Sequence, residues 1–158
     1  MKPLIKAVIV GAAAFAASAG VPAAQHANDI AAIQSILSSY EAALNASDTD
    51  AVLALYAADG VFMPQHGSPN VGADAVRAAY GAVFKAIKLE IAFEIDEIAQ
   101  VAPDWAFART RSSGFVNINA TGFRAPEANQ ELFVFKKSDT GAWRIARYIF
   151  STTNPPRP

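Results

Sequence analysis

The sequence predicts an α+β domain in which three helices come first and a curved antiparallel sheet follows them. Apolar residues recur at helical spacing in the first half of the chain, and they alternate with polar residues in the second half. Turn-forming residues separate these segments. A chain of 158 residues, 53% of them hydrophobic, can build one such domain with a sizeable core. An intrinsically disordered chain is therefore excluded.

The N-terminal segment has the features of a secretory signal peptide. Two lysines precede an apolar run over residues 7–17, which is followed by the small residues Ser18 and Ala19. The run is shorter than the ~20 residues that cross a bilayer. We therefore expect an exported bacterial protein, periplasmic or secreted, with no membrane contact once the signal is removed. The alternatives are a retained membrane anchor and a genuine first helix.

The first helix of the domain is expected over residues 28–44. Its apolar residues recur at steps of three and four, which places them on one stripe of the helix. They are Ile30, Ile33, Leu37, Tyr40 and Leu44. Ser47 is expected to cap a short second helix, with Asp50 three residues later as in a capping box. Tyr56 faces inward from this helix.

A short strand and a third helix complete the predicted first half. The strand covers residues 61–63 and ends at Met63. Two prolines and two glycines indicate a loop over residues 64–72. The third helix is expected over residues 73–86, where apolar side chains again follow helical spacing.

The second half of the chain predicts four strands. Apolar and polar residues alternate over residues 89–95, as in a half-buried strand. Further strands are expected over 105–117, 131–137 and 143–151, with a tight turn at 139–141 between the last two. The expected organisation is a signal peptide over 1–19, a mobile mature N-terminus over 20–27, a single domain over 28–152 and an extended, mobile tail over 153–158.

Composition excludes several kinds of site. Thirteen basic and 14 acidic side chains give a net charge of -1, so there is no electrostatic reason to expect a nucleic acid partner. The chain has no cysteine, which rules out disulfides, thiol catalysis and iron–sulfur clusters. Two histidines without metal-ligand spacing argue against a metal site. Neither a glycine-rich phosphate loop nor a nucleophile elbow is present in the predicted domain, so we expect no dinucleotide cofactor.

Strand parity selects a carboxylate and a guanidinium as candidate site residues. Glu131 shares a strand face with Phe133 and Phe135. Apolar surroundings raise a carboxyl pKa, which favours general acid–base chemistry near neutral pH. Arg109 likewise shares a face with the aromatic side chain of Trp105. If Arg109 and Glu131 are cross-strand neighbours, they form a structural ion pair or hold a ligand.

Three further residues are candidates for chemistry. The Tyr148 hydroxyl can donate to a developing oxyanion, or it can simply be satisfied in the core. His66 lies in the predicted loop and has the residue type best suited to proton transfer near neutral pH, although most loop histidines are solvated. Glu127 precedes the strand of Glu131 and is a candidate acid at the rim. Glu94 and Asp96 alternate with apolar residues and are expected to form a solvated face.

The order of elements resembles the nuclear transport factor 2-like superfamily, which includes ketosteroid isomerases and SnoaL-like polyketide cyclases. Three segments are similar to its SgcJ/EcaC-like branch: GVFMPQHGSPNVGADAVRAAYGAVFKAIKLEIAFEIDEI, WAFARTRSSG and EANQELFVFKKSDTGAWRIARYIF. The resemblance implies a cone-shaped sheet with a pocket between its concave face and the helices. The chain departs from the branch at Gln130, where a basic residue is common, and at Ser151, where asparagine is common. The aspartate and tyrosine constellation of ketosteroid isomerases does not map onto this chain.

Three functions remain open from the sequence. The first is a pocket for a small, largely apolar or aromatic molecule. Its ligand-binding candidates are Arg109, Trp105, Phe133, Tyr56 and Met63. The second is a cofactor-independent isomerase, cyclase or dehydratase, in which Glu131 or His66 moves a proton while Tyr148 or Arg109 stabilises an oxyanion.

The third is an assembly module. An outward patch of Trp143, Ile145 and Ile149 predicts a homodimer, which we expect whichever function holds. Periodicity alone leaves open which face of this last strand is concave.

Overall fold

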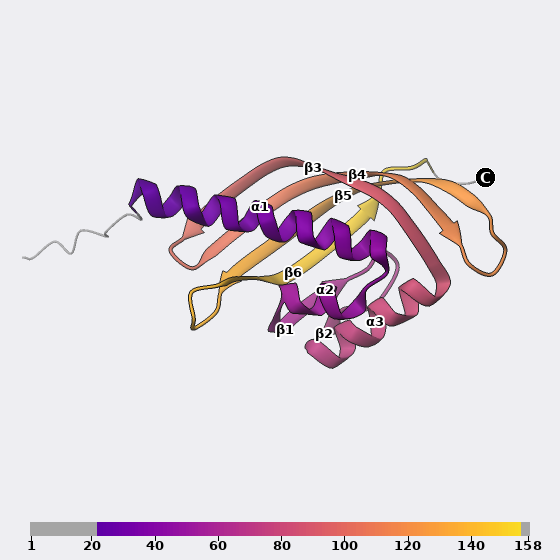
Figure 1. Ribbon diagram of the computed structural model, residues 1–158, viewed down its shortest axis with the longest axis horizontal. Helices are drawn as coiled ribbons and strands as arrows, with labels where there is room; N and C mark the ends of the chain where they lie inside the picture. The colour runs from indigo at the N-terminus through magenta and orange to yellow at the C-terminus, as the bar shows by residue number, and fades with distance from the viewer. Residues whose placement is uncertain (1–21, 156–158) are drawn as a thin grey trace, which may run out of the picture.

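The computed structural model describes residues 22–155 (Figure 1). The predicted signal peptide over 1–19 lies outside these residues. None of the helices among the described residues is long and apolar enough to span a membrane. In chain order the elements are α1 (Ala23–Ala46), α2 (Thr49–Leu55), β1 (Tyr56–Met63), β2 (Asn70–Val71), α3 (Ala73–Ala86), β3 (Ile87–Ala102), β4 (Trp105–Ile118), β5 (Arg124–Lys137) and β6 (Trp143–Thr152).

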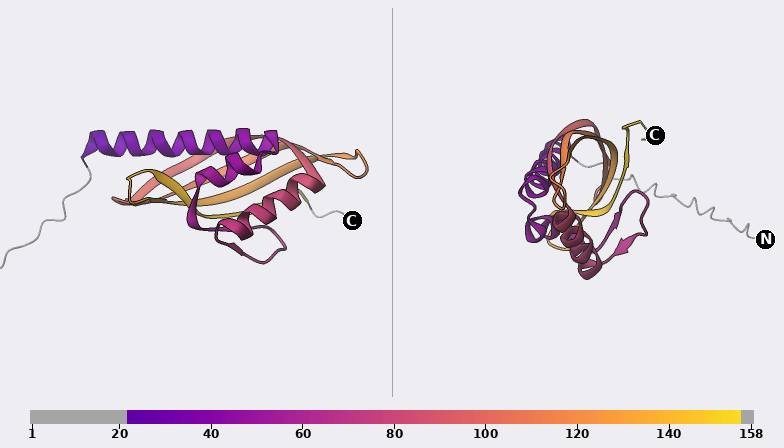
Figure 2. Two further views of the ribbon diagram at one scale, coloured as in Figure 1. Left: turned by 60° about the horizontal axis from the view of Figure 1, so that its bottom comes forward. Right: turned by 90° about the vertical axis from the view of Figure 1, so that its right-hand side faces the viewer.

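Six strands form one curved, unclosed sheet in the order β2-β1-β6-β5-β4-β3. The three helices lie against one side of it, and the view down the long axis shows the sheet curling toward them (Figure 2). The predicted α+β class is confirmed. The prediction of a purely antiparallel sheet is wrong at one pairing, because β1 runs parallel to β6. The long chain segment between these two strands permits parallel pairing, which a tight hairpin cannot make.

The junction between α1 and α2 differs from the prediction by one residue. Helix α1 begins at Ala23, five residues before the expected start, and ends where Ser47 adopts a left-handed conformation with φ 55°. The N-cap of α2 is therefore Asp48, whose carboxylate accepts a hydrogen bond from the Ala51 N–H at 2.9 Å. The assignment of Ser47 as N-cap is wrong because Ser47 terminates the preceding helix.

Helix α1 also protects the edge strand β3. The Asn45 amide donates to the Ile91 carbonyl at 2.7 Å and accepts from the Ile91 N–H at 2.9 Å. One turn earlier on α1, Glu41 accepts from the Phe93 N–H at 2.6 Å. Satisfying these backbone groups removes part of the free edge that another strand would use for pairing.

Aromatic rings occupy the space between the sheet and the helices. Phe133 is fully buried and stacks on Tyr148, with 4.3 Å between ring centroids. The Tyr80 hydroxyl is hydrogen-bonded to the Tyr40 and Tyr56 hydroxyls, at 2.5 and 2.9 Å between oxygens. The Tyr56 hydroxyl therefore belongs to a buried cluster of three tyrosine hydroxyls, and Phe133 is part of the core.

A bulge in β6 decides which side chains of that strand face inward. Val134 pairs with Arg147, but the next residue of β5 pairs with Ile145, so the register skips one residue of β6. Trp143 and Ile145 are consequently buried, 3% and 0% exposed. The predicted outward patch is wrong, because only its third member, Ile149, is exposed. The homodimer itself stays a prediction.

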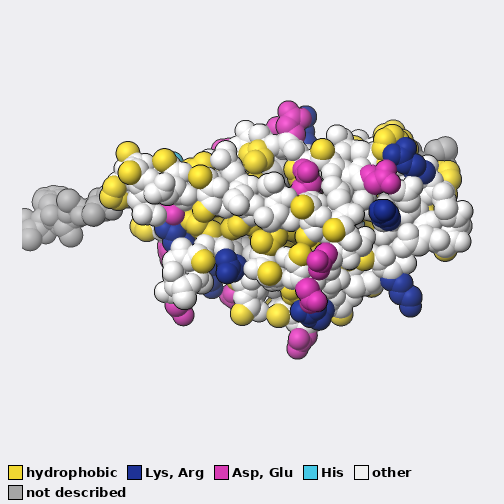
Figure 3. Space-filling view, in the orientation of Figure 1, with side chains coloured by type: hydrophobic (Ala, Val, Ile, Leu, Met, Phe, Trp, Pro, Cys, Tyr) yellow, Lys and Arg dark blue, Asp and Glu magenta, His cyan; other side chains and the backbone are white. Residues whose placement is uncertain are grey.

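Charged side chains of both signs are interspersed on the helix-covered side of the molecule (Figure 3). This distribution matches the balanced composition of 13 basic and 14 acidic residues. A single-sign field that would steer a charged macromolecule is not seen on this side of the described chain.

Candidate functional site

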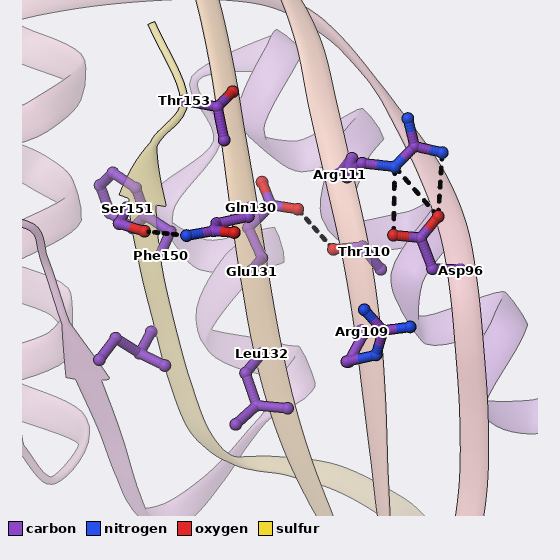
Figure 4. A pocket seen from close by; sticks show the side chains of 11 residues that line it. Asp96, Arg109, Thr110, Arg111, Gln130, Glu131, Leu132, Phe150, Ser151 and Thr153 are labelled. Carbon is purple, nitrogen blue, oxygen red and sulfur yellow. Dashed lines mark hydrogen bonds and ion pairs between the residues drawn. The ribbon is translucent and has the colours of Figure 1, made fainter. Parts of the chain in front are cut away.

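Glu131 projects from β5 toward the helix-covered side of the sheet. Its Cα partner on β4 is Thr110. The carboxylate accepts a hydrogen bond from the Thr110 hydroxyl (Figure 4). It also accepts one from the Ser112 hydroxyl, at 2.6 Å. The residue is only 6% exposed. Among residues 22–155 no basic side chain forms an ion pair with it, so two hydroxyl groups replace a cationic partner.

Burial raises the pKa of the Glu131 carboxyl, and the hydrogen bonds from Ser112 and Thr110 offset only part of that effect. A buried charge without a counterion is costly, and protonation relieves the cost. The carboxyl group is thus closer than an ordinary glutamate to the pH at which it can both accept and return a proton.

A row of polar side chains runs from Glu131 toward the N-terminal end of β5. The Asn129 amide nitrogen donates to the Ser112 oxygen at 3.3 Å and to the Glu127 carboxylate at 3.0 Å. Because Ser112 in turn donates to Glu131, the row runs from a half-buried carboxylate to a buried one. We call these four residues the polar row.

The polar row borders a hollow of about 870 Å³, which we call the rim hollow. Its lining residues are Gln65, His66, Glu127, Asn129, Phe150, Thr152, Asn154 and Pro155. Asn129 pairs with Thr152 across the two strands, and Glu131 pairs with Phe150. Glu131 therefore lies two residues after Asn129 on the same face of β5. It is next to Phe150, whose aromatic ring lines the hollow.

Tyr148 lies two residues before Phe150, on the same face of β6, and pairs with Phe133 of β5. Burial raises the pKa of its hydroxyl well above the ordinary value, and the charge of Glu131 adds to the effect. The hydroxyl therefore stays protonated and remains a hydrogen-bond donor at neutral pH. This is the chemical state that the predicted oxyanion role requires.

His66 lines the rim hollow from the loop that follows β1, and its backbone has a φ of 60°. The Gln65 amide oxygen accepts from the Thr152 N–H, which fixes the amide nitrogen toward the His66 Nε2 at 2.8 Å. An amide nitrogen can only donate, so Nε2 accepts and the ring proton lies on Nδ1. In this arrangement the Nε2 atom of His66 already accepts a hydrogen bond from the Gln65 amide.

Arg109 and Glu131 are not cross-strand neighbours, so the ion pair that depended on this condition does not form. Arg109 lies on the opposite face of the sheet, its Cα partner on β5 is Leu132, and its guanidinium binds Glu97 at 2.8 Å. Trp105 shares that outer face and is 37% exposed, so it does not line the interior. The physical reason is that parity groups residues within a strand, but the register between two strands decides which residues face each other.

The outer face carries a second, smaller depression of about 440 Å³, whose lining residues are drawn in Figure 4. Glu131 is also among its lining residues. The two arginines that line it are already paired, Arg109 with Glu97 at 2.8 Å and Arg111 with Glu94 and Asp96, both at 2.9 Å. The Gln130 amide also donates to the Ser151 hydroxyl on this face, at 3.0 Å. The two departures from the branch pattern are thus hydrogen-bonded neighbours.

Met63, the remaining ligand-binding candidate, is the last residue of β1. Its Cα partner on β6 is Ile149, and it is half-buried. The candidates from the sequence are therefore spread over both faces of the sheet. His66 and Glu127 line the rim hollow, and Glu131 and Tyr148 lie beside Phe150, another of its lining residues.

No group of three or more histidine, aspartate or glutamate side chains within residues 22–155 has a geometry that could hold a metal ion. The family model of the SnoaL-like domain matches residues 36–147, which is most of the chain. The chain belongs to the SnoaL-like domain family. No protein with a curated function matches it.

The fold of this SnoaL-like domain is similar to that of several solved structures. A ketosteroid isomerase-like protein from Erwinia carotovora atroseptica is 39% identical with a TM-score of 0.78, and the match covers 80% of this chain and 98% of that one. A conserved protein from Planctomyces limnophilus is 24% identical with a TM-score of 0.69, over 80% and 98% of the two chains. A hexachlorocyclohexane dehydrochlorinase from Novosphingobium barchaimii is 11% identical with a TM-score of 0.73, over 83% and 90%. The last two show the fold alone.

Sequence reasoning missed the polar partners of Glu131 in this SnoaL-like domain. One face of β4 carries Ala106 and Ala108. Among the described residues of this strand, the only polar side chains on that face are Thr110 and Ser112. Two hydroxyl groups on a buried face were therefore visible in the sequence. Asn129 lies on the same face as Glu131 and was visible by parity as well.

Proposed function

We propose that this protein binds a small, largely apolar or aromatic molecule at the rim hollow and exchanges a proton with it through Glu131. The observation that carries the proposal is a buried carboxylate that faces aromatic rings, has a raised pKa and is held by two hydroxyl groups instead of a cation. Such a carboxylate is more useful to acid–base chemistry than to stability.

The proton balance of the proposed step is simple. Ionised Glu131 takes a proton from a carbon next to a carbonyl group of the bound molecule, which leaves an enolate and a neutral Glu131 carboxyl. The Tyr148 hydroxyl donates a hydrogen bond to the enolate oxygen. Glu131 then returns the proton to the same carbon, which gives exchange, or to a neighbouring carbon, which gives isomerisation.

Two further observations support the proposal. Phe150 lines the hollow and pairs with Glu131 across the sheet, so a bound aromatic body and the carboxylate are held side by side. The similar structure with 39% identity carries the name of a ketosteroid isomerase-like protein. An isomerase-like reaction needs a group that accepts and returns a proton, which is the role we assign to Glu131.

A glutamine at position 131 tests this function. Acetophenone is a carbon acid with an aromatic body, and proton exchange at its methyl group in heavy water is followed by proton NMR. We expect the wild-type protein to accelerate the exchange over buffer, and Glu131→Gln to reduce the acceleration by roughly 10²–10⁴-fold. The amide preserves shape and can still accept from one of the two hydroxyl groups, so folding should be retained.

Glu94→Gln is the matched control, because Glu94 lies on the outer face and its side chain is 70% exposed. This variant should exchange acetophenone protons at the wild-type rate. Equal exchange by Glu131→Gln and the wild-type protein would rule out the proton-transfer role. Retained binding of acetophenone without any exchange would instead favour a binding protein without chemistry.

A further inference from the structure

One buried polar atom in the polar row has no hydrogen-bond partner. The Asn129 side chain is 7% exposed, and its amide oxygen Oδ1 receives no hydrogen bond from the described residues. Both hydrogens of its amide nitrogen are used, one by Ser112 and one by Glu127. An unsatisfied buried acceptor is uncommon in folded proteins and calls for an explanation.

The orientation of this amide is fixed by its neighbours. A carboxylate accepts hydrogen bonds and cannot donate them, so the amide nitrogen must face Glu127. The Ser112 hydroxyl spends its hydrogen on Glu131 and therefore accepts from Asn129. Turning the amide over would set two oxygens against each other at the Glu127 contact. The unpaired atom is therefore the oxygen, and the missing partner is a donor.

The two carboxylates nearest to Asn129 in the polar row are also acceptors. Glu127 lines the rim hollow beside Asn129, and Glu131 lies behind it along the same strand face. Among residues 22–155, no basic side chain forms an ion pair with either carboxylate. The lining of the hollow thus includes Glu127 and Phe150 together with Asn129, whose amide oxygen is itself buried.

We propose that the rim hollow selects molecules that carry an O–H or N–H donor on an aromatic or apolar body, and that Asn129 Oδ1 receives this donor. The proposal rests on the function proposed above and names the class of its ligand. Asn129 lines the hollow, so a seated molecule reaches the oxygen after side-chain adjustment of the kind common at binding sites. Anionic molecules are disfavoured by the nearby carboxylates.

Three probes with the same body test this selection. They are para-phenylphenol, which has a donor, its methyl ether, which has none, and para-phenylbenzoate, which is an anion. Binding to the uniformly ¹⁵N-labelled protein is titrated by NMR, with the Asn129 side-chain amide signals as the local reporter. We expect the phenol to bind about tenfold more tightly than the ether, as one hydrogen bond to a buried acceptor provides. The benzoate should bind more weakly than either.

Two leucine variants locate the effect. Asn129→Leu removes the unpaired oxygen and should bring the phenol and the ether to equal affinity. Gln130→Leu changes the adjacent residue of β5, which faces the other side of the sheet, and should keep the tenfold preference. Thermal unfolding of both variants shows whether each is folded. If Asn129→Leu does not fold, the shift of the Asn129 amide signals in the wild-type titration still decides the question.

Several outcomes overturn the inference. Equal affinity of phenol and ether for the wild-type protein would remove donor selection, while the proton-transfer role of Glu131 would stand on its own exchange assay. An unchanged phenol preference in Asn129→Leu would show that Asn129 Oδ1 does not receive the ligand donor, and it would overturn the inference. Failure of all three probes to bind at millimolar concentration would show that the rim hollow does not receive aromatic molecules.

Discussion

Replacing Asp29 by alanine is expected to lower the free energy of unfolding by about 3 kcal/mol, as removal of one partner from a buried ion pair does. Asp29 lies on α1 and is 4% exposed. Its carboxylate accepts from Lys137 at 2.8 Å, from the Trp143 indole at 2.9 Å and from Gln25 and Gln100 at 3.0 Å. Alanine leaves a mostly buried ammonium and a buried indole N–H without their acceptor.

The pH dependence of this contribution follows from the direction of the pKa shift. Burial alone would raise the pKa of Asp29, but the hydrogen bonds from Lys137, Trp143 and the two glutamines outweigh it and lower the pKa from 3.8 to about 2. A carboxyl group with a lowered folded-state pKa stabilises the fold above its unfolded pKa. The difference between wild type and Asp29→Ala should therefore be full above pH 4 and shrink as the pH falls toward about 2.

Asp50→Ala is the control for this measurement. Asp50 forms an ion pair with Arg77, but the two side chains are 82% and 55% exposed. Removing such a surface pair should change the free energy of unfolding by less than about 1 kcal/mol. Urea unfolding of both variants makes the comparison. Equal losses in the two variants would show that Asp29 does not hold α1 to the sheet.

Gly114→Ala is expected to destabilise the protein by about 2–3 kcal/mol, with thermal unfolding as the measurement. Gly114 lies on β4 opposite Ile91 of the edge strand and has a φ of 153°. A Cβ atom there would overlap the Glu90 carbonyl oxygen and lie 2.9 Å from the Ile91 Cα atom. Both contacts are with backbone, so the two strands would have to separate to make room.

Gly81→Ala is the matched control on α3. A Cβ atom at Gly81 meets no atom within 4 Å, and alanine is a better helix former than glycine. We expect this variant to be as stable as the wild-type protein or up to about 1 kcal/mol more stable. A Gly114→Ala protein that unfolds at the wild-type temperature would contradict the close approach of β3 and β4 at this position.

The sequence predicts elements well where the signal is local. The apolar stripe predicted α1, and Ile33, Leu37, Tyr40 and Leu44 are buried as expected, whereas Ile30 is only partly buried. Alternation predicted that Glu131 and Phe133 share one face of β5, and both are buried. Each of these inferences needs only the period of one element, which the side chains of that element set by themselves.

Relations between elements were not accessible in the same way. Whether Arg109 faces Glu131 depends on the register of β4 and β5, which the chain between them sets. The bulge at Ala146 reverses the parity of β6, so Ile145 and Tyr148 both point inward although they are three residues apart. A bulge has no strong local signal, because it serves the curvature of the whole sheet.

The pKa of Glu131 is the quantity on which the account of the site depends. Carbon NMR of the labelled carboxyl group measures it across a pH titration, and the Glu131→Gln spectrum assigns the signal. We expect the pKa of the Glu131 carboxyl to lie above the ordinary 4.5, because burial disfavours the charged form more than the Thr110 and Ser112 hydroxyl groups stabilise it. A pKa at or below 4.5 would show that the carboxylate is well solvated or fully compensated, and it would contradict the assignment of Glu131 as the group that exchanges a proton.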